Sequence, residues 1–441
     1  MFVIKDNVYV GYSCGRIVLS TGDHTEHLPI KYLSEGSSIL LCSLLTNNHD
    51  NNLIKKLFKD NADFSFQQQK LIEDLRPYLI ETTSQKENRV SFDKLWKSKS
   101  RAGENPSNFR LDYPIKLVVI PTWKCNRTCT YCGVPKISPN DFEEQLDPQL
   151  LIERIIDAVD NGVQEIVFHG GEPIFFYEQI LDHIHQLRLR NVKIQISTKN
   201  HISKELARRL AIAGISKIQL SIDTVDSELC QLLYGDKEYA NKLADSVSNL
   251  LSESIQPRIN VVLSTLNYRG IVNLLTFLDS LQVSEVEISN YRCGSINELN
   301  LNLNKQECAW LHRAIVKNQT KWNIKHLIFG DFIENARNAE ERPVCESARF
   351  GIVILPDGRT CYCDFLCENT DFCFGNIKSA LIGQIWNDSD LIKKAFPSKD
   401  MFDSDSKCRT CSSLKQCIDR GICYVKAGGN FDRDYKCNEC F

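Results

Sequence analysis

The pattern of hydrophobic and polar positions is most regular between residues 112 and 320. Short β-branched runs alternate there with longer stretches in which apolar residues recur at helical spacing. The runs that predict strands are 116–120, 165–168, 192–196, 217–222, 259–263 and 286–288. The stretches that predict helices lie near 148–161, 177–190, 203–213, 237–254, 268–280 and 304–318. Six such units predict an α/β fold with a parallel sheet curved into a partial (β/α)6 TIM-like barrel, in which ligands bind at the carboxyl ends of the strands.

The first 90 residues have a different, α+β pattern. Short β-prone runs at 8–12 and 16–20 flank Ser13-Cys14-Gly15, which is typical of a hairpin turn, and a third run lies around 27–30. Apolar-periodic segments follow at about 35–46, 52–58 and 64–80. We therefore predict a small domain over 1–90, a polar linker over 91–111, the barrel over 112–320 and a tail domain over 321–441.

Composition and charge narrow the class of protein. The 441 residues are 42% hydrophobic and 25% charged, with a formal net charge of −3. These values are typical of a globular protein and provide no basic field for nucleic acid or an anionic membrane. No apolar run reaches the ~18 residues of a transmembrane helix, and the first residues lack the pattern of a signal peptide. We expect no nucleic-acid or membrane partner and a cytoplasmic location.

Cysteines are unevenly distributed. The chain has 19, and 13 of them lie from Cys293 onward. In a reducing compartment, clustered cysteines are more typical of metal ligands than of disulfides. The distribution therefore predicts a metal-binding tail.

A second, tighter group of cysteines follows the first predicted strand of the barrel. Cys125, Cys129 and Cys132 are spaced C-x3-C-x2-C on the loop that begins at Pro121. Three thiolates on one short loop can hold three corners of a 4Fe–4S cube and leave one iron open to another ligand. Three unrelated thiols or a zinc knuckle are the alternatives, but zinc sites favour paired C-x2-C units and four ligands.

This spacing, with Tyr131 before the third cysteine, resembles the signature of the radical S-adenosylmethionine (radical SAM) superfamily. The resemblance implies that the open iron binds S-adenosylmethionine and that Tyr131 lies against the adenine. It also implies reductive cleavage to methionine and a 5′-deoxyadenosyl radical, which abstracts hydrogen from a substrate. A six-unit partial barrel is the fold of this family, so the motif agrees with the predicted strands.

Residues at the ends of later strands extend the resemblance. His169-Gly170-Gly171-Glu172-Pro173 resembles the family's Gly-Gly-Glu-Pro motif, which hydrogen-bonds the methionine amino group. Glycines permit close backbone approach, and a carboxylate can accept hydrogen bonds from an ammonium. The end of the third strand partly matches a family Thr-Asn-Gly near the ribose and carboxylate, and the end of the fourth resembles its Ser-x-Asp. These matches imply cofactor-binding roles for Ser197, Asn200, Ser221 and Asp223.

Two of these strand ends offer catalytic candidates. Asp223 could face cofactor or substrate, or it could cap the following helix. Cys293 lies past the sixth strand, where its thiol would reach the mouth of the barrel, although a buried inert thiol is the alternative. Arg258 and Arg292 could reach carboxylates or lie on the surface.

The tail resembles the SPASM domain, which binds auxiliary iron–sulfur clusters. By this resemblance, one 4Fe–4S cluster is held by Cys345, Cys363 and Cys423. Its fourth ligand is Cys361, Cys367 or Cys373, or is absent. The second cluster is held by Cys408, Cys411, Cys417 and either Cys437 or Cys440. Cys423 arrives two residues late, because Gly421 stands where the pattern has cysteine. A zinc ribbon is the alternative for the paired C-x2-C units.

The order of elements over 1–90 resembles the winged-helix-like recognition domain of peptide-modifying enzymes, in which a leader peptide adds as an extra strand. A structural cap or a nucleic-acid-binding winged helix is the alternative for this domain. Together the resemblances imply a radical SAM peptide maturase with three 4Fe–4S clusters that crosslinks a ribosomally made precursor peptide (thioether, C–C or C–O). Its expected partners are that peptide and an electron donor such as flavodoxin or ferredoxin. A formylglycine-forming sulfatase maturase and a non-catalytic iron–sulfur sensor are the alternatives.

Overall fold

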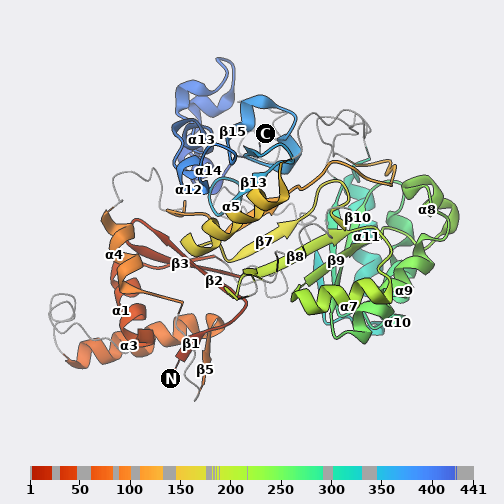
Figure 1. Ribbon diagram of the computed structural model, residues 1–441, viewed down its shortest axis with the longest axis horizontal. Helices are drawn as coiled ribbons and strands as arrows, with labels where there is room; N and C mark the ends of the chain where they lie inside the picture. Colours follow the sequence, from red (N-terminus) through yellow and green to blue (C-terminus); the bar gives the residue numbers. More distant parts are fainter. Residues whose placement is uncertain are drawn as a thin grey trace. The chain divides into compact units, whose positions relative to one another are not determined.

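The chain forms two compact units, Met1–Ile115 and Lys116–Phe441. The computed structural model describes residues 2–21, 30–46, 61–82, 89–100, 110–132, 146–174, 181, 184, 186–187, 189–215, 217–291, 301–329, 345–422 and 424. Figure 1 shows both units with their elements labelled.

The first unit is an α+β arrangement around one hydrophobic core. Its strands are β1 (Phe2–Ile4), β2 (Val8–Ser13), β3 (Arg16–Thr21), β4 (Lys31–Tyr32) and β5 (Leu79–Glu81), and its described helices are α1 (Glu35–Thr46), α3 (Asn61–Leu75) and α4 (Phe92–Ser100). Strands β2, β3 and β4 form one antiparallel sheet, and β1 pairs with β5. The predicted hairpin is confirmed: Cys14 and Gly15 have φ values of 50° and 75°, as a two-residue type I′ turn requires.

Two details of this unit differ from the expectation. The segment predicted as helix over 64–80 ends as an α-helix at Leu75, because Pro77 in the 3-10 turn Arg76–Tyr78 cannot continue it, and residues 79–81 pair with β1 as β5. The predicted linker contains α4, whose Leu95 is fully buried and whose Ser98 hydroxyl accepts a hydrogen bond from Gly15 N. The predicted helix at 52–58 and most of the run at 27–30 lie outside the described residues.

One edge of the three-stranded sheet is covered by the unit's own chain. Asp112 N donates to the Tyr12 carbonyl at 2.9 Å, and the Ser13 hydroxyl donates to the Arg110 carbonyl at 2.8 Å, so the segment 110–112 lies along β2. A Cβ on Gly11 would lie 2.6 Å from the Leu111 side chain, which explains the glycine. The opposite edge of the sheet is β4.

The second unit is built on one curved sheet. Its strands are β6 (Lys116–Val119), β7 (Glu165–Phe168), β8 (Lys193–Thr198), β9 (Lys217–Ser221), β10 (Pro257–Leu263), β11 (Glu285–Asn290), β12 (His326–Phe329), β13 (Gly351–Ile354), β14 (Arg359–Cys361) and β15 (Cys373–Asn376). The order of strands across the sheet is β12-β11-β10-β9-β8-β7-β6-β13-β14-β15. Every pair of neighbours from β12 to β13 in this order is parallel. All six predicted strands are present, and β12 adds a seventh to the barrel.

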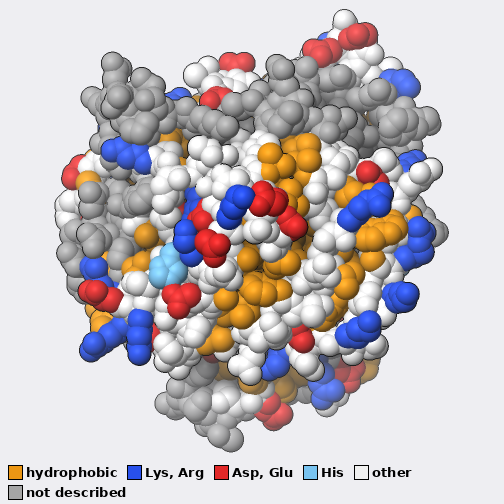
Figure 2. Space-filling model, turned by 90° about the vertical axis from the view of Figure 1, so that its right-hand side faces the viewer, with side chains coloured by type: hydrophobic (Ala, Val, Ile, Leu, Met, Phe, Trp, Pro, Cys, Tyr) orange, Lys and Arg blue, Asp and Glu red, His pale blue; other side chains and the backbone are white. Residues whose placement is uncertain are grey.

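Helices follow the strands as the pattern predicts, except that most of the predicted helix at 177–190 lies outside the described residues. They are α5 (Pro148–Asn161), α7 (Lys204–Ala213), α8 (Ser227–Tyr234), α9 (Tyr239–Ser252), α10 (Ile271–Ser280) and α11 (Lys305–Asn318), with α12 (Ile382–Trp386), α13 (Ser389–Ala395) and α14 (Leu414–Arg420) in the tail. Helix α8 was not predicted. On the side that carries α8 to α10, hydrophobic side chains are exposed between charged ones (Figure 2). None of the described helices has the length and apolar character that a membrane crossing requires.

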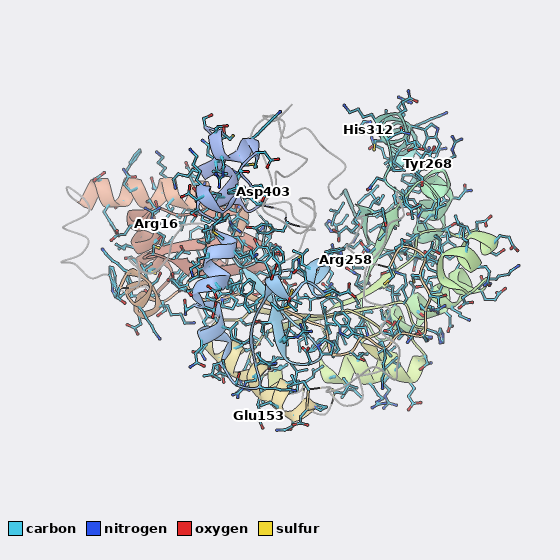
Figure 3. The ribbon with its side chains drawn as sticks, turned by 90° about the horizontal axis from the view of Figure 1, so that it is seen from above. Arg16, Glu153, Arg258, Tyr268, His312 and Asp403 are labelled. Atoms are coloured by element: carbon cyan, nitrogen blue, oxygen red, sulfur yellow. The ribbon has the colours of Figure 1, made fainter. Side chains whose placement is uncertain are left out.

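The two faces of the sheet differ in polarity. In β8, Ile194, Ile196 and Thr198 are buried, whereas Gln195 and Ser197 lie on the other, less buried face. That second face continues across the sheet as a row of polar and charged side chains. Gln195 contacts Gln219, and Arg258 pairs with both Glu285 and Glu287. The sheet therefore has an apolar face for helix packing and a polar concave face, on which Arg258 lies in Figure 3.

Candidate active site

The cysteine loop leaves the carboxyl end of β6 without regular secondary structure. Cys129 is buried, Cys132 is half-buried and Cys125 is exposed. Burial raises the pKa of the Cys129 thiol to about 11, so metal binding there must displace a proton. The loop is attached to α8, because Thr130 N and the Thr130 hydroxyl donate to the Leu233 and Leu232 carbonyls at 3.2 and 2.7 Å.

Arg127, between the first two cysteines, provides a second attachment. Its guanidinium donates to Asp236 at 2.8 Å and to the Lys199 carbonyl at 3.3 Å, and it lies 4.8 Å from the centroid of the Tyr239 ring. The side chain is 10% exposed. A charge-assisted contact with so little solvent access holds the loop against the turn between α8 and α9.

The end of β7 packs directly under the cysteine loop. Gly171 N and Glu172 N donate to the Thr122 and Lys124 carbonyls at 3.1 and 2.7 Å. A Cβ on Gly171 would lie 2.5 Å from the Lys124 carbonyl oxygen, and Gly170 has a φ of 118°. Both glycines therefore serve the close approach of two backbone segments, which places Glu172 beside the cysteines. Pro173 follows and is buried.

The Glu172 carboxylate is buried and held by three donors. It accepts hydrogen bonds from the Thr198 hydroxyl at 2.7 Å, from Lys199 N at 3.1 Å and from Ile174 N at 3.2 Å. Burial raises the pKa of Glu172, and these donors oppose the rise. An oriented carboxylate of this kind can accept hydrogen bonds from a ligand ammonium.

Thr198, and not its predicted neighbour Ser197, makes the contact with Glu172. The two side chains lie on opposite faces of β8, and Ser197 is on the polar concave face. Asn200 accepts a hydrogen bond from Asn126 of the cysteine loop at 2.8 Å. The alternation of buried residues along β8 was the signal that could have identified Thr198.

Asp223 joins the cysteine loop to two later elements. Its buried carboxylate accepts hydrogen bonds from the Tyr131 and Tyr234 hydroxyls and from Val262 N at 2.7 Å. Burial first and the neighbouring Asp223 second raise the pKa of Tyr131 and Tyr234 well above the usual range. Asp223 is not a helix cap: Asp226 caps α8 by accepting from Leu229 N at 2.8 Å.

Lys199 brings a positive charge to the centre of this site. Its ammonium lies 5.6 Å from the Tyr131 ring centroid and 5.8 Å from that of Tyr234. Burial by itself would lower the pKa of Lys199, but the nearby Cys129 and Asp223 raise it above its usual value. The neighbouring Ser221 is buried, and its carbonyl accepts from the Tyr239 hydroxyl at 2.5 Å.

Part of the predicted tail site also lies at this end of the sheet. Cys363 follows β14, and its thiol contacts Asp364 at 3.3 Å. Asp364 lies 3.6 Å from His169, the residue before Gly170. Burial first, then Asp364 and Cys345, raise the pKa of the Cys363 thiol well above its usual value, and Cys345 N donates to the Arg420 carbonyl at 2.7 Å. The structure therefore places Cys363 near the end of β7, with Cys345 within electrostatic range of it.

Two short helices of the tail meet at Arg349. Its buried guanidinium donates to the carbonyls of Asp419, Ala395 and Ile418, which fixes α13 and α14 relative to β13. Cys417 lies on α14 and is buried, whereas Cys408 and Cys411 are half-buried in the turn before it. Cys293, Cys423, Cys437, Cys440 and Arg292 lie outside the described residues.

These residues fit a cluster with one open iron. Within the described part of the chain, no three His, Cys, Asp or Glu side chains converge on a point where one metal ion could sit. A 4Fe–4S cube needs no such convergence, because each thiolate binds a different iron. The fixed Glu172 carboxylate and the Lys199 ammonium beside the cysteine loop complement the amino and carboxylate groups of an amino-acid ligand.

The chain resembles known proteins in sequence and in fold. Residues 119–278 match the sequence profile of the radical SAM superfamily, and residues 345–412 match that of SPASM, an iron–sulfur cluster-binding domain. A GTP 3′,8-cyclase of Campylobacter jejuni is 28% identical over 169 residues, which is 36% of this chain and only 50% of the cyclase. The PqqA peptide cyclase of Granulibacter bethesdensis is 25% identical over 329 residues, 72% of this chain and 84% of that protein.

Solved structures extend the likeness in fold. Streptococcus suis SuiB bound to precursor peptide SuiA has a TM-score of 0.74 at 18% identity, covering 99% of this chain and 100% of SuiB. The anSMEcpe protein with bound AdoMet has a TM-score of 0.54 at 16% identity, covering 74% of this chain and 95% of that protein. The SuiB fold therefore accounts for the whole chain, whereas that of anSMEcpe accounts for three quarters of it.

Proposed function

We propose that this chain, which carries a radical SAM domain followed by an SPASM domain, is an enzyme that modifies a ribosomally made precursor peptide. The modification we propose is an intramolecular crosslink, a thioether, C–C or C–O bond. The observation that carries the proposal is the likeness in fold to SuiB with its precursor peptide over 99% of the chain. The likeness to a PqqA peptide cyclase, over 84% of that protein, supports a peptide substrate.

The residues of the site have separate roles in this proposal. When bound, the cluster and S-adenosylmethionine supply the 5′-deoxyadenosyl radical that abstracts a hydrogen atom from the peptide. Cys125, Cys129 and Cys132 hold the cluster, and Glu172, fixed by Thr198 and the backbone, accepts from the methionine amino group. Asp223 keeps the Tyr131 ring in one orientation, where it can support the adenine. Ser197, Asn200 and Ser221 complete the cofactor site.

The auxiliary clusters and partners follow from the same proposal. We assign Cys345, Cys363 and Cys423 to one auxiliary 4Fe–4S cluster, and Cys408, Cys411, Cys417 and either Cys437 or Cys440 to a second. With the radical SAM cluster these make three. A cytoplasmic donor such as flavodoxin or ferredoxin supplies electrons.

The first unit binds the leader of the peptide in this proposal. Edge strands offer unpaired backbone groups to an added strand. The segment 110–112 already lies along β2, so we assign the leader to the β4 side of the sheet. The fold of anSMEcpe covers only 74% of this chain, which is why the formylglycine-forming alternative is second.

Two measurements on the full chain test the proposal. After anaerobic reconstitution, iron is counted and 5′-deoxyadenosine is measured under reducing conditions with S-adenosylmethionine. We expect about twelve irons, from three four-iron clusters, and turnover. Candidate precursor peptides are then titrated with and without their leaders. We expect tight binding only with the leader, and a product that has lost two hydrogens. Binding that does not depend on the leader would refute the assignment of the first unit, and absence of deoxyadenosine would refute the enzyme.

A further inference from the structure

Three tail cysteines, Cys361, Cys367 and Cys373, are candidates for the fourth ligand of the first auxiliary cluster, but the assignment proposed above uses none of them. Two of them face each other. Cys361 ends β14 and Cys373 begins β15, and the two are direct partners in the antiparallel register. Directly opposed residues in such a pair have Cα atoms about 4.5–5.5 Å apart. A disulfide spans about 4.4–6.8 Å between Cα atoms, so the strands hold these cysteines at a separation that a disulfide can bridge.

The side chains lie on the same face as well, because directly opposed residues of an antiparallel pair project to one side with Cβ atoms about 4.5–5.5 Å apart. Cys361 is fully buried and Cys373 is half-buried, so an oxidant in solution reaches Cys373 first. Arg359 places its guanidinium 3.8 Å from the Cys373 sulfur, where it stabilises a thiolate. One accessible thiol beside an arginine and one buried thiol behind it is an arrangement suited to thiol–disulfide exchange.

We propose that Cys361 and Cys373 form a reversible disulfide on exposure to a glutathione-type disulfide. The Cys373 thiolate attacks the oxidant R–S–S–R, releases one thiolate RS⁻ and forms a mixed disulfide. Cys361 then gives up its proton and attacks the Cys373 sulfur, which forms the protein disulfide and releases the second RS⁻. Two cysteine electrons pass to the oxidant, and two RSH are formed. The bond ties β14 to β15 immediately before Cys363, so it secures the strand end that presents that residue.

The experiment uses the reconstituted full chain in graded ratios of reduced to oxidised glutathione. Reactions are quenched with acid, free thiols are alkylated, and the linked peptides are identified by mass spectrometry. Trypsin leaves both cysteines in one peptide, since no Lys or Arg occurs between Arg359 and Lys378. Cleavage before Asp364 and Asp371 separates them. We expect a Cys361–Cys373 link that dithiothreitol reverses, while Cys230 remains a free thiol.

Variants separate this role from cluster ligation. In Cys361→Ser, Cys373 should accumulate as the mixed disulfide with glutathione, and the iron content should equal that of the parent. Cys367→Ser is the matched control and should form the same link as the parent. Loss of iron in Cys361→Ser or Cys373→Ser would make these residues cluster ligands and overturn the proposal. A link between Cys367 and Cys373, or no link at any glutathione ratio, would also overturn it.

Discussion

The two cysteine-bearing regions of the second unit are built in different ways. The cysteine loop after β6 has no regular structure. Thr130, Tyr131 and Arg127 attach it to a backbone carbonyl of α8, to the carboxylate that follows β9 and to the carboxylate of the α8–α9 turn. The tail cysteines are on a hairpin, a short turn and α14, and one buried arginine, Arg349, joins α14 to α13. The loop is therefore attached through several of its own residues, whereas a single side chain joins two helices of the tail.

The largest effect should come from Arg349→Met. The change leaves three buried carbonyls without their charged donor, each contact being worth about 1.5–3 kcal/mol. We expect a loss of several kcal/mol in tail stability and loss of auxiliary-cluster iron, measured by iron content and thermal unfolding. Arg349→Lys should be intermediate, because an ammonium cannot reproduce the planar fork. Equal loss of iron from the cysteine loop would contradict the separation of the two regions.

Gly171→Ala should affect the loop alone. The new methyl group would overlap the backbone of Trp123 and Lys124, so the cysteine loop must shift. A displacement of about 1 Å can lower a rate about 100-fold, and we expect a loss of that size in deoxyadenosine formation, with auxiliary iron retained. Gly270→Ala is the control, since no atom lies within 4 Å of its Cβ position. An active Gly171→Ala protein would show that this packing is not needed.

Asp223→Asn should have a smaller effect on both stability and cofactor binding. The amide has one acceptor oxygen in place of two and brings donors toward the Tyr131 and Tyr234 hydroxyls. We expect about 1–3 kcal/mol lower stability in denaturant titration and weaker S-adenosylmethionine binding. Asp226→Asn is the control. Asp226 is the N-cap of α8, and stability should be unchanged because asparagine caps helices as well as aspartate does. Similar losses in both variants would exclude a special role for Asp223.

Arg127→Lys should have the smallest effect of the four. The lysine keeps the charge opposite Asp236 but loses the second hydrogen bond and the planar stacking on Tyr239. We expect a loss of about 1 kcal/mol, seen as faster removal of loop iron by a chelator. The Lys242 side chain, which is 47% exposed, is the other cation that pairs with Asp236. Lys242→Met should therefore leave the rate of iron removal unchanged. If Lys242→Met has the greater effect, Arg127 is not the attachment.

The sequence predicted most where the chemistry is local. Cys125, Cys129 and Cys132 lie within eight residues, and the six strands could be identified from their apolar runs. The sequence predicted less where the register of a strand decides which side chain reaches the site. Ser197 and Thr198 are adjacent but face opposite sides of β8. Whether Asp223 caps the following helix could be decided only once α8 was known to begin at Ser227.

The pattern of hydrophobic and polar positions also could not predict which side chains pair across neighbouring strands. Arg258 was expected on the surface or at a ligand, but it is buried and paired with Glu285 and Glu287 of the next strand. Its partners could be recognised only after β10 and β11 were aligned. The tail cysteines posed the same problem, since the opposition of Cys361 and Cys373 depends on the register of β14 and β15.

The pairing of β13 with β6 also affects how the chain folds during synthesis. Strand β6 gains β7 after one helix, but its other neighbour, β13, is made only after β12 is complete. Until then β6 is an open sheet edge, and open edges pair readily with other chains. Because domains generally fold as they leave the ribosome, the barrel remains exposed to aggregation until the tail begins. The tail thus protects the nascent barrel before it binds any iron.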